Sequence, residues 1–223
     1  MISPKSPSII NEYISDEKSP ITTSSGFAST SDFSPYETAS PNDETPSVTA
    51  TTVTFLFKND ETCAVEILQN GRRKKLKNIF DNEWTPLYFS MAQPTPEIGE
   101  KAQIHCHQFR EHVLYDIFKV IGIPINEIEY DPEWKFKVVM EKGIKCFQIK
   151  TQKGLQSFPE HIIVGIFLKS MKKQAENYLN SEIHEVVVTS NFDITESQKY
   201  IFKNAASKVH LKILSFNVNT DFE

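Results

Sequence analysis

The chain has 223 residues, a formal net charge of −5 and three cysteines. This length suits one globular domain of ordinary size, and the acidic balance argues against a general attraction to nucleic acid or to anionic membranes. Cys63, Cys106 and Cys146 are too few and too scattered for a disulfide framework or a zinc cage. Because the chain shows neither a signal-peptide core nor a stretch of membrane-spanning length, we expect a cytoplasmic or nuclear protein.

Residues 1–52 are rich in serine, threonine and proline, and their few apolar residues follow no sustained period. Such a segment cannot bury enough surface to offset the entropy of ordering, so we expect a disordered tail. Six residues precede a proline and could accept phosphate from proline-directed kinases: Ser3, Ser6, Ser19, Ser34, Ser40 and Thr45. The alternative is that these dipeptides arise by chance in a low-complexity extension.

Four short apolar runs follow and predict strands at 53–57, 63–68, 75–80 and 87–92. The pair Asn70-Gly71 between the second and third runs is a strong hairpin signal. The only basic run of the chain lies where this turn and the next strand are expected, and comprises Arg72, Arg73, Lys74, Lys75 and Lys77. We interpret this run as a solvated sheet edge rather than a nucleic-acid site.

Helical patterns are expected at 96–106 and 108–121, and three further strands at 135–140, 146–150 and 155–158. Glycines at 143 and 154 mark the turns between these strands.

The segment from 157 to 217 alternates helix and strand. Ser157, Pro159 and Glu160 provide a helix start signal. The continuous valines 186–188 predict a strand covered on both faces in a mostly parallel sheet. Asp193 and Glu196 suggest a second capping pair before a helix that extends to about Ser207, and a last strand follows at 211–216. A strand, helix and strand in this order form a right-handed βαβ unit.

Several of these motifs, in this order and spacing, resemble the ATPase domain of the seventy-kilodalton heat-shock chaperones between about Val53 and Thr220. The matching motifs are DIFKVIG at 116–122, WKFKVV at 134–139, Phe158-Pro159-Glu160, the valine strand at 186–189, Ser197-Gln198 and the strand that ends at Asn217. The resemblance implies an α/β fold, the ribonuclease H-like first lobe of an actin-like ATPase with an inserted α/β subdomain.

In this family a glycine-containing loop contacts metal-bound phosphates, because backbone amides must approach the anion closely. The resemblance places this loop on Leu56, Phe57, Lys58, Asn59 and Asp60, where the family has aspartate, leucine, glycine and two threonines. All five positions depart from the family pattern, so the carboxylate near magnesium is lost and Lys58 adds bulk where the γ-phosphate would lie. Lys58 could attract phosphate as a point charge, or it is an ordinary exposed lysine.

The catalytic lysine of the family falls on Phe118, with Lys119 one position later, and a shift of one residue on a helix rotates a side chain by about 100°. The catalytic glutamate falls on Val218 or Asn219, depending on a one-residue gap, and neither can serve as an acid or base. The second phosphate loop, the adenosine pocket and the second lobe would follow Glu223, so we expect a truncated domain.

Other candidate sites are weaker. On a helix the imidazoles of His105 and His107 in His105-Cys106-His107 would point about 200° apart, so a metal site there needs a strand or further ligands. We therefore expect no metal site. Trp84 and Trp134 flank predicted strands and are expected to anchor packing.

These observations favour a non-catalytic relative of the chaperone ATPase domain that acts by binding protein, with no catalytic residues and no cofactor. The expected partners are regulators of the chaperones or another chaperone-family chain. We also expect the surface that a missing second lobe would cover to be apolar. One alternative is a chaperone-type ATPase with residual binding of ATP and magnesium, and another is that the tail is the functional part and the folded region is its scaffold.

Overall fold

The computed structural model describes residues 51–221. The disordered tail and the six phosphorylation sites predicted within residues 1–52 lie outside this part of the chain, apart from Thr51 and Thr52. Thr52 already belongs to the first strand.

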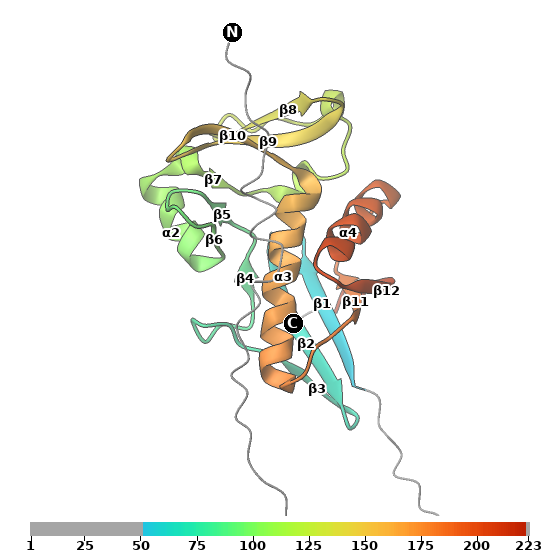
Figure 1. Ribbon diagram of the computed structural model, residues 1–223. Helices are drawn as coiled ribbons and strands as arrows, with labels where there is room; N and C mark the ends of the chain where they lie inside the picture. Colours follow the sequence, from blue (N-terminus) through green and yellow to red (C-terminus); the bar gives the residue numbers. More distant parts are fainter. Residues whose placement is uncertain (1–50, 222–223) are drawn as a thin grey trace, which may run out of the picture.

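A mixed sheet forms the centre of the molecule (Figure 1), in the order β12-β11-β1-β2-β3. Its strands are β1 Thr52–Lys58, β2 Thr62–Gln69, β3 Arg72–Lys75, β11 Glu185–Ser190 and β12 Lys212–Val218, and a short β4, Thr85–Pro86, also pairs with β2. β1 is parallel to β11, which is parallel to β12, whereas β1, β2 and β3 are antiparallel. The expected mostly parallel sheet is therefore parallel only on one side of β1.

The predicted hairpin between β2 and β3 is confirmed. Asn70 and Gly71 both have positive φ, 52° and 72°, as a two-residue turn that matches the twist of the strands requires. The third strand, however, spans Arg72–Lys75 instead of 75–80, because residues 77–84 form a loop.

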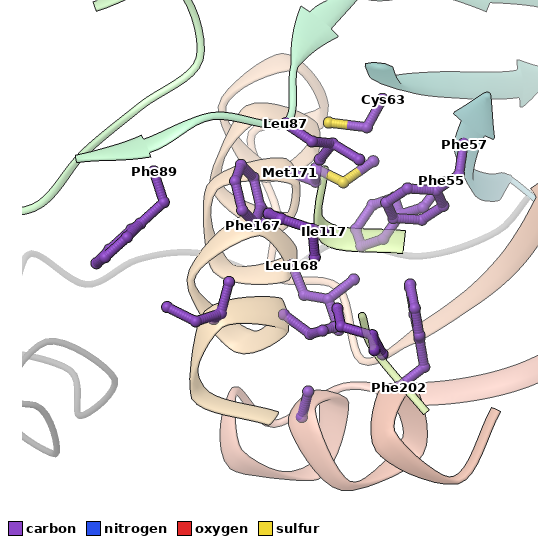
Figure 2. Close-up of a cluster of buried hydrophobic side chains, with 14 of the residues drawn as sticks. Phe55, Phe57, Cys63, Leu87, Phe89, Ile117, Phe167, Leu168, Met171 and Phe202 are labelled. Atoms are coloured by element: carbon purple, nitrogen blue, oxygen red, sulfur yellow. The ribbon is translucent and has the colours of Figure 1, made fainter. Parts of the chain in front are cut away.

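Two helices, α3 Glu160–Leu179 and α4 Glu196–Lys208, pack against each other and lie on one face of the sheet (Figure 1). Phe167, Leu168 and Met171 of α3 and Phe202 of α4 are buried beside Phe55 and Phe57 of β1 (Figure 2). The expectation that the valine strand is covered on both faces holds only in part. Val186 and Val188 are buried, but Val187 is half-buried and lines a groove on the opposite face.

An insertion between β4 and α3 carries two small sheets and a helix. Its elements are β5 Phe89–Ser90, β6 Glu97–Ile98, α2 Glu100–Gln108, β7 Val113–Leu114, β8 Lys137–Glu141, β9 Ile144–Thr151 and β10 Gly154–Pro159, with short 3-10 turns at Arg110–His112, Ile117–Lys119 and Ile125–Glu127. The strands order as β6-β5-β7 and β10-β9-β8. The three strands predicted in the second half of the insertion are confirmed, and Trp134 is buried as expected, with Nε1 donating to Asp116 at 2.9 Å.

The helix predicted at 108–121 is wrong. Residues 113 and 114 form the short strand β7, which pairs with β5 and is fully buried. The apolar residues here are adjacent, so they serve a buried strand better than one helical face, and Asp116 at φ 55° interrupts any helix.

Both predicted helix caps are also different in the structure. Ser157 lies in β10, and Pro159 is the N-cap of α3 without a side-chain hydrogen bond. Glu160 instead accepts a hydrogen bond from the amide of Gly122 at 2.9 Å and pairs with Lys145 at 3.0 Å. At α4 the cap is Thr195, in a capping box with Gln198, and Asp193 plays no part in it.

Candidate functional site

The end of β1 and the turn that follows it hold the residues that the resemblance assigns to phosphate binding. Leu56 is buried within β1, and the Lys58 ammonium lies 4.1 Å from the centre of the Trp84 ring. Asp60 accepts a hydrogen bond from the Thr62 hydroxyl at 2.6 Å. Lys58 is half-buried, and its ammonium makes a cation–π contact with Trp84.

The backbone of this turn is tied to the loop that follows β11. The Asn59 amide donates to Asn191 Oδ1 at 2.8 Å, and Asn191 Nδ2 donates to Asn59 Oδ1 at 3.2 Å. The Asn191 amide in turn donates to the Phe57 carbonyl at 3.2 Å. The turn amide that would face an anion in a phosphate cradle is therefore already hydrogen-bonded to a side chain.

Phe118, at the position of the catalytic lysine, belongs to a cluster of phenylalanines. Its ring lies 5.8 Å from Phe57, 4.9 Å from Phe192 and 6.1 Å from Phe202. Edge-on and stacked pairs at these distances favour packing beyond simple burial. The neighbouring Lys119 is exposed, and its ammonium pairs with Asp116 at 3.1 Å.

Glu61 joins the two parts of the site. Its carboxylate accepts hydrogen bonds from the amides of Ile117 and Phe118, each at 3.0 Å, so the β1–β2 turn is fixed to the turn that carries Phe118. Burial raises the pKa of Glu61 to about 7, with Asp116 adding to the rise, although the two amides and Lys119 oppose it.

Val218 ends β12, and Asn219 follows it with its amide donating to the Ser190 carbonyl at 2.8 Å. Asn219 and Leu56 line the same groove, about 930 Å³ in volume, on the sheet face opposite α3 and α4. Lys58, Asn59, Asp60, Phe118 and Val218 do not line it. The structure thus brings only two of the seven predicted positions together in one groove.

The face that the groove occupies is mixed in character rather than apolar. Thr52, Thr54 and Thr189 line it together with Glu66 and Lys75. The groove is therefore not a continuous apolar surface, because threonines and charged residues lie on this side of the strands.

His105 lies on helix α2, where its Nδ1 is 3.0 Å from the Ser90 hydroxyl, and His107 is exposed on the same helix. Within residues 51–221 no group of three or more histidine, cysteine or acidic side chains is arranged to hold a metal ion. Over the same residues no helix is long and apolar enough to span a membrane.

Sequence reasoning missed Glu61, Asn191 and Phe192. Glu61 has a positive φ of 60°, which no local motif announces. Asn191 and Phe192 lie in the loop between a strand and a helix, where the sequence carries no special signal. Their roles depend on contacts with Asn59 and Phe118, which are more than seventy positions away.

Comparisons with known proteins agree with this arrangement. The family model of the Hsp70 protein matches residues 59–218. A human protein named putative heat shock 70 kDa protein 7 is 26% identical over 153 residues, which are 67% of this chain and 42% of that protein. The heat shock cognate HSP70 protein of Trypanosoma brucei brucei is 28% identical over 155 residues, 67% of this chain and 23% of that protein.

A third relative, heat shock 70 kDa protein 14-B of Xenopus laevis, is 25% identical over 158 residues, which are 69% of this chain and 31% of that protein. The chain thus spans less than half the length of each of these relatives. The mixed sheet, its two covering helices and the inserted sheets are the arrangement of an actin-like ATPase lobe. Since the family model matches well over half of its residues, the chain belongs to the Hsp70 family.

Proposed function

We propose that this chain is a non-catalytic Hsp70-family protein that acts by binding protein and does not turn over ATP. The observation that carries the proposal is Phe118. An aromatic ring packed among Phe57, Phe192 and Phe202 stands where the family needs a lysine that can reach a phosphate. Phosphoryl transfer depends on positioning and on charges that stabilise the transition state, and a phenylalanine offers no charge.

The β1–β2 turn supports the same conclusion. A magnesium-bound phosphate fits a cradle of unengaged amides with a carboxylate beside the metal. Here the Asn59 amide is bonded to Asn191, and the buried Leu56 stands where the family has the carboxylate. The residues present therefore do not fit a magnesium nucleotide.

Calorimetric unfolding of the full chain with and without ATP and magnesium tests this proposal. A ligand present at about 100 times its dissociation constant adds about 2.7 kcal/mol to the stability of the native state. We expect ATP with magnesium to leave the unfolding temperature where magnesium alone leaves it. A family member with the glycine-containing loop serves as the positive control. Saturable binding of a labelled nucleotide at micromolar concentration would contradict the proposal and favour the residual ATPase.

The proposed partners are regulators of Hsp70 chaperones or a second chaperone-family chain, because these proteins meet the first lobe of other family members. Size-exclusion chromatography with light scattering, on the full chain mixed with a purified Hsp70 or a purified regulator, measures such a complex directly. We expect a species whose mass is the sum of the two chains for at least one of these partners. Separate elution of every pair would count against this part of the proposal.

A further inference from the structure

The central sheet ends in two edge strands of very different character. β3, Arg72–Lys75, closes one side with four cations in a row. Positive charges on an edge strand oppose pairing with a strand of another chain. β12, Lys212–Val218, closes the other side (Figure 1). Its only charged residue, Lys212, lies at the start of the strand and pairs with Glu185 at 2.9 Å, so the remaining six residues carry no charge.

The outer backbone of β12 is open. β11 is its neighbour on one side, and in the part of the chain that the structure describes no strand pairs with it on the other. The Asn219 amide donates toward β11 at 2.8 Å. Because successive residues of a strand point their N–H and C=O groups to opposite sides, those of Phe216 and Val218 point away from β11. The register between the two strands also skips Leu214, which therefore has no partner in β11.

Leu214, Phe216 and Val218 form an apolar strip along this open edge. Alternate residues of a strand share one face of the sheet. That face is the one that α4 covers, because the Phe216 ring lies 6.3 Å from the Phe202 ring and 5.8 Å from the Lys203 ammonium. Leu214 is 52% exposed and Val218 is 54% exposed. An open backbone beside uncovered apolar side chains is a template for a further strand.

The same edge of a second copy fits this strip. When two β12 strands run antiparallel about a two-fold axis at Phe216, each Phe216 faces its counterpart and each Leu214 faces Val218 of the other copy. These three facing pairs would form about six backbone hydrogen bonds, and apolar side chains that face each other stabilise a sheet. Lys212 of each copy lies beyond the paired segment. We infer that two copies of this chain associate through their β12 strands into one continuous sheet.

The geometry of this contact limits the assembly to two chains. A two-fold contact uses the β12 edge of both copies and leaves only the cationic β3 edges outside. One pair of strands buries little surface, so we expect a weak association with a dissociation constant in the micromolar range. The contact needs no other protein and does not depend on the partners proposed above.

Sedimentation of the full chain measures this association. Between about 1 and 100 µM we expect the average mass to rise from that of one chain toward that of two. A mass of one chain over the whole range would overturn the inference, and so would growth beyond two chains.

Charged substitutions at the two exposed positions test which residues face each other. Leu214→Lys with Val218→Lys places like charges opposite each other, so the dissociation constant should rise at least about tenfold. Leu214→Lys with Val218→Glu places opposite charges there and should associate at least about tenfold more tightly than the variant with two lysines. Leu155→Lys, at a position 69% exposed on β10, is the control and should change nothing. Circular dichroism checks that each variant is folded, and equal association of the two double variants would overturn the inference.

Cysteine variants test the same register without added charge. Ser215 and Asn217 of the two copies would face each other at non-hydrogen-bonded positions, where Cα atoms lie about 4.5 Å apart. A Ser215→Cys chain mixed with an Asn217→Cys chain should give a disulfide-linked dimer under mild oxidation. Trypsin releases residues 213–223, which carry either cysteine, for identification by mass spectrometry.

Each cysteine variant alone, and the original chain with its three cysteines, are the controls. They should give at least fivefold less linked dimer than the mixture. Equal yields from the mixture and from the single variants, or no linked dimer above that of the original chain, would assign any association to another surface and overturn the inference.

Discussion

Glu61 shows how one side chain outside any recognised motif can hold a site together. Its carboxylate accepts from the amides of Ile117 and Phe118, so it fixes the orientation of the turn that carries the phenylalanine cluster. This arrangement buries the carboxyl group of Glu61, and the burial raises its pKa to about 7. A group of this kind makes folding depend on pH.

Stability should therefore fall as the pH rises through the range in which Glu61 ionises. The folded chain holds a proton between about pH 4.5, the ordinary pKa, and about pH 7, whereas the unfolded chain has released it. The contribution of protonated Glu61 to the free energy of unfolding is fully present below pH 4.5 and is lost as the pH rises through 7. This contribution amounts to at most about 3 kcal/mol. Glu61→Gln should flatten this dependence in urea unfolding measured at a series of pH values. Parallel curves for the variant and the original chain would show that Glu61 does not titrate in this way.

At the scale of elements, α4 depends on its first turn. Thr195 accepts from the Gln198 amide at 3.3 Å, and the Gln198 side chain accepts from the Thr195 amide at 2.9 Å. The buried Gln198 also packs against Gly122, where a Cβ would lie 2.8 Å from its amide nitrogen. The start of α4 thus joins the insertion to the helical layer.

Thr195→Ala should lower the free energy of unfolding by about 1 kcal/mol, because it removes one half of the capping box. Asp193→Ala is the matched control, since Asp193 is exposed and takes no part in the cap. Denaturant unfolding of both variants measures the difference. Equal losses for the two would contradict the assignment of Thr195 as the cap.

Elements with strong local signals were predictable. The Asn70-Gly71 turn, the long apolar stripe of α3 and the run of valines in β11 each carry their own period or turn chemistry. The structure of segment 108–121 was not predictable, because Val113 and Leu114 form a strand only through their pairing with β5. The cap residues Pro159 and Thr195 lie within two residues of Ser157 and Asp193, which carry stronger local capping signals.

At the scale of the molecule, the buried side chains of the sheet and of the insertion form one connected core. Phe55 of β1, Phe89 of β5, Phe147 of β9 and Phe158 of β10 all belong to it. Phe89 and Phe158 touch across the insertion at 5.5 Å between ring centres. Neither part has a separate core of its own among the residues that the structure describes.

Unfolding should consequently be a single cooperative transition. In a single transition the calorimetric enthalpy of unfolding equals the van't Hoff enthalpy. In a Trp84→Phe variant, the fluorescence of Trp134 in the insertion should follow the same curve as the circular dichroism of the helices. Two separate transitions would mean that the insertion unfolds independently of the sheet.

The family and the general fold could be anticipated from the order of short motifs, as the match over residues 59–218 confirms. The local details of the site could not. The contact between Lys58 and Trp84, the bonds between Asn59 and Asn191, and the ring pairs of Phe118 all join residues that are distant in sequence. The predicted loss of phosphate-binding residues stays a prediction, which nucleotide titration can measure.

The central place of β1 affects how this protein is made. β1 pairs with β11 through contacts such as Thr54 with Val187. This pairing cannot form until about 130 further residues have been synthesised. A ribosome that adds about 5 to 20 residues per second leaves that edge open for roughly 7 to 27 seconds. An apolar strand with one bare edge invites pairing with neighbouring nascent chains. The edge of β1 is therefore open to strand pairing with other nascent chains until β11 has been synthesised.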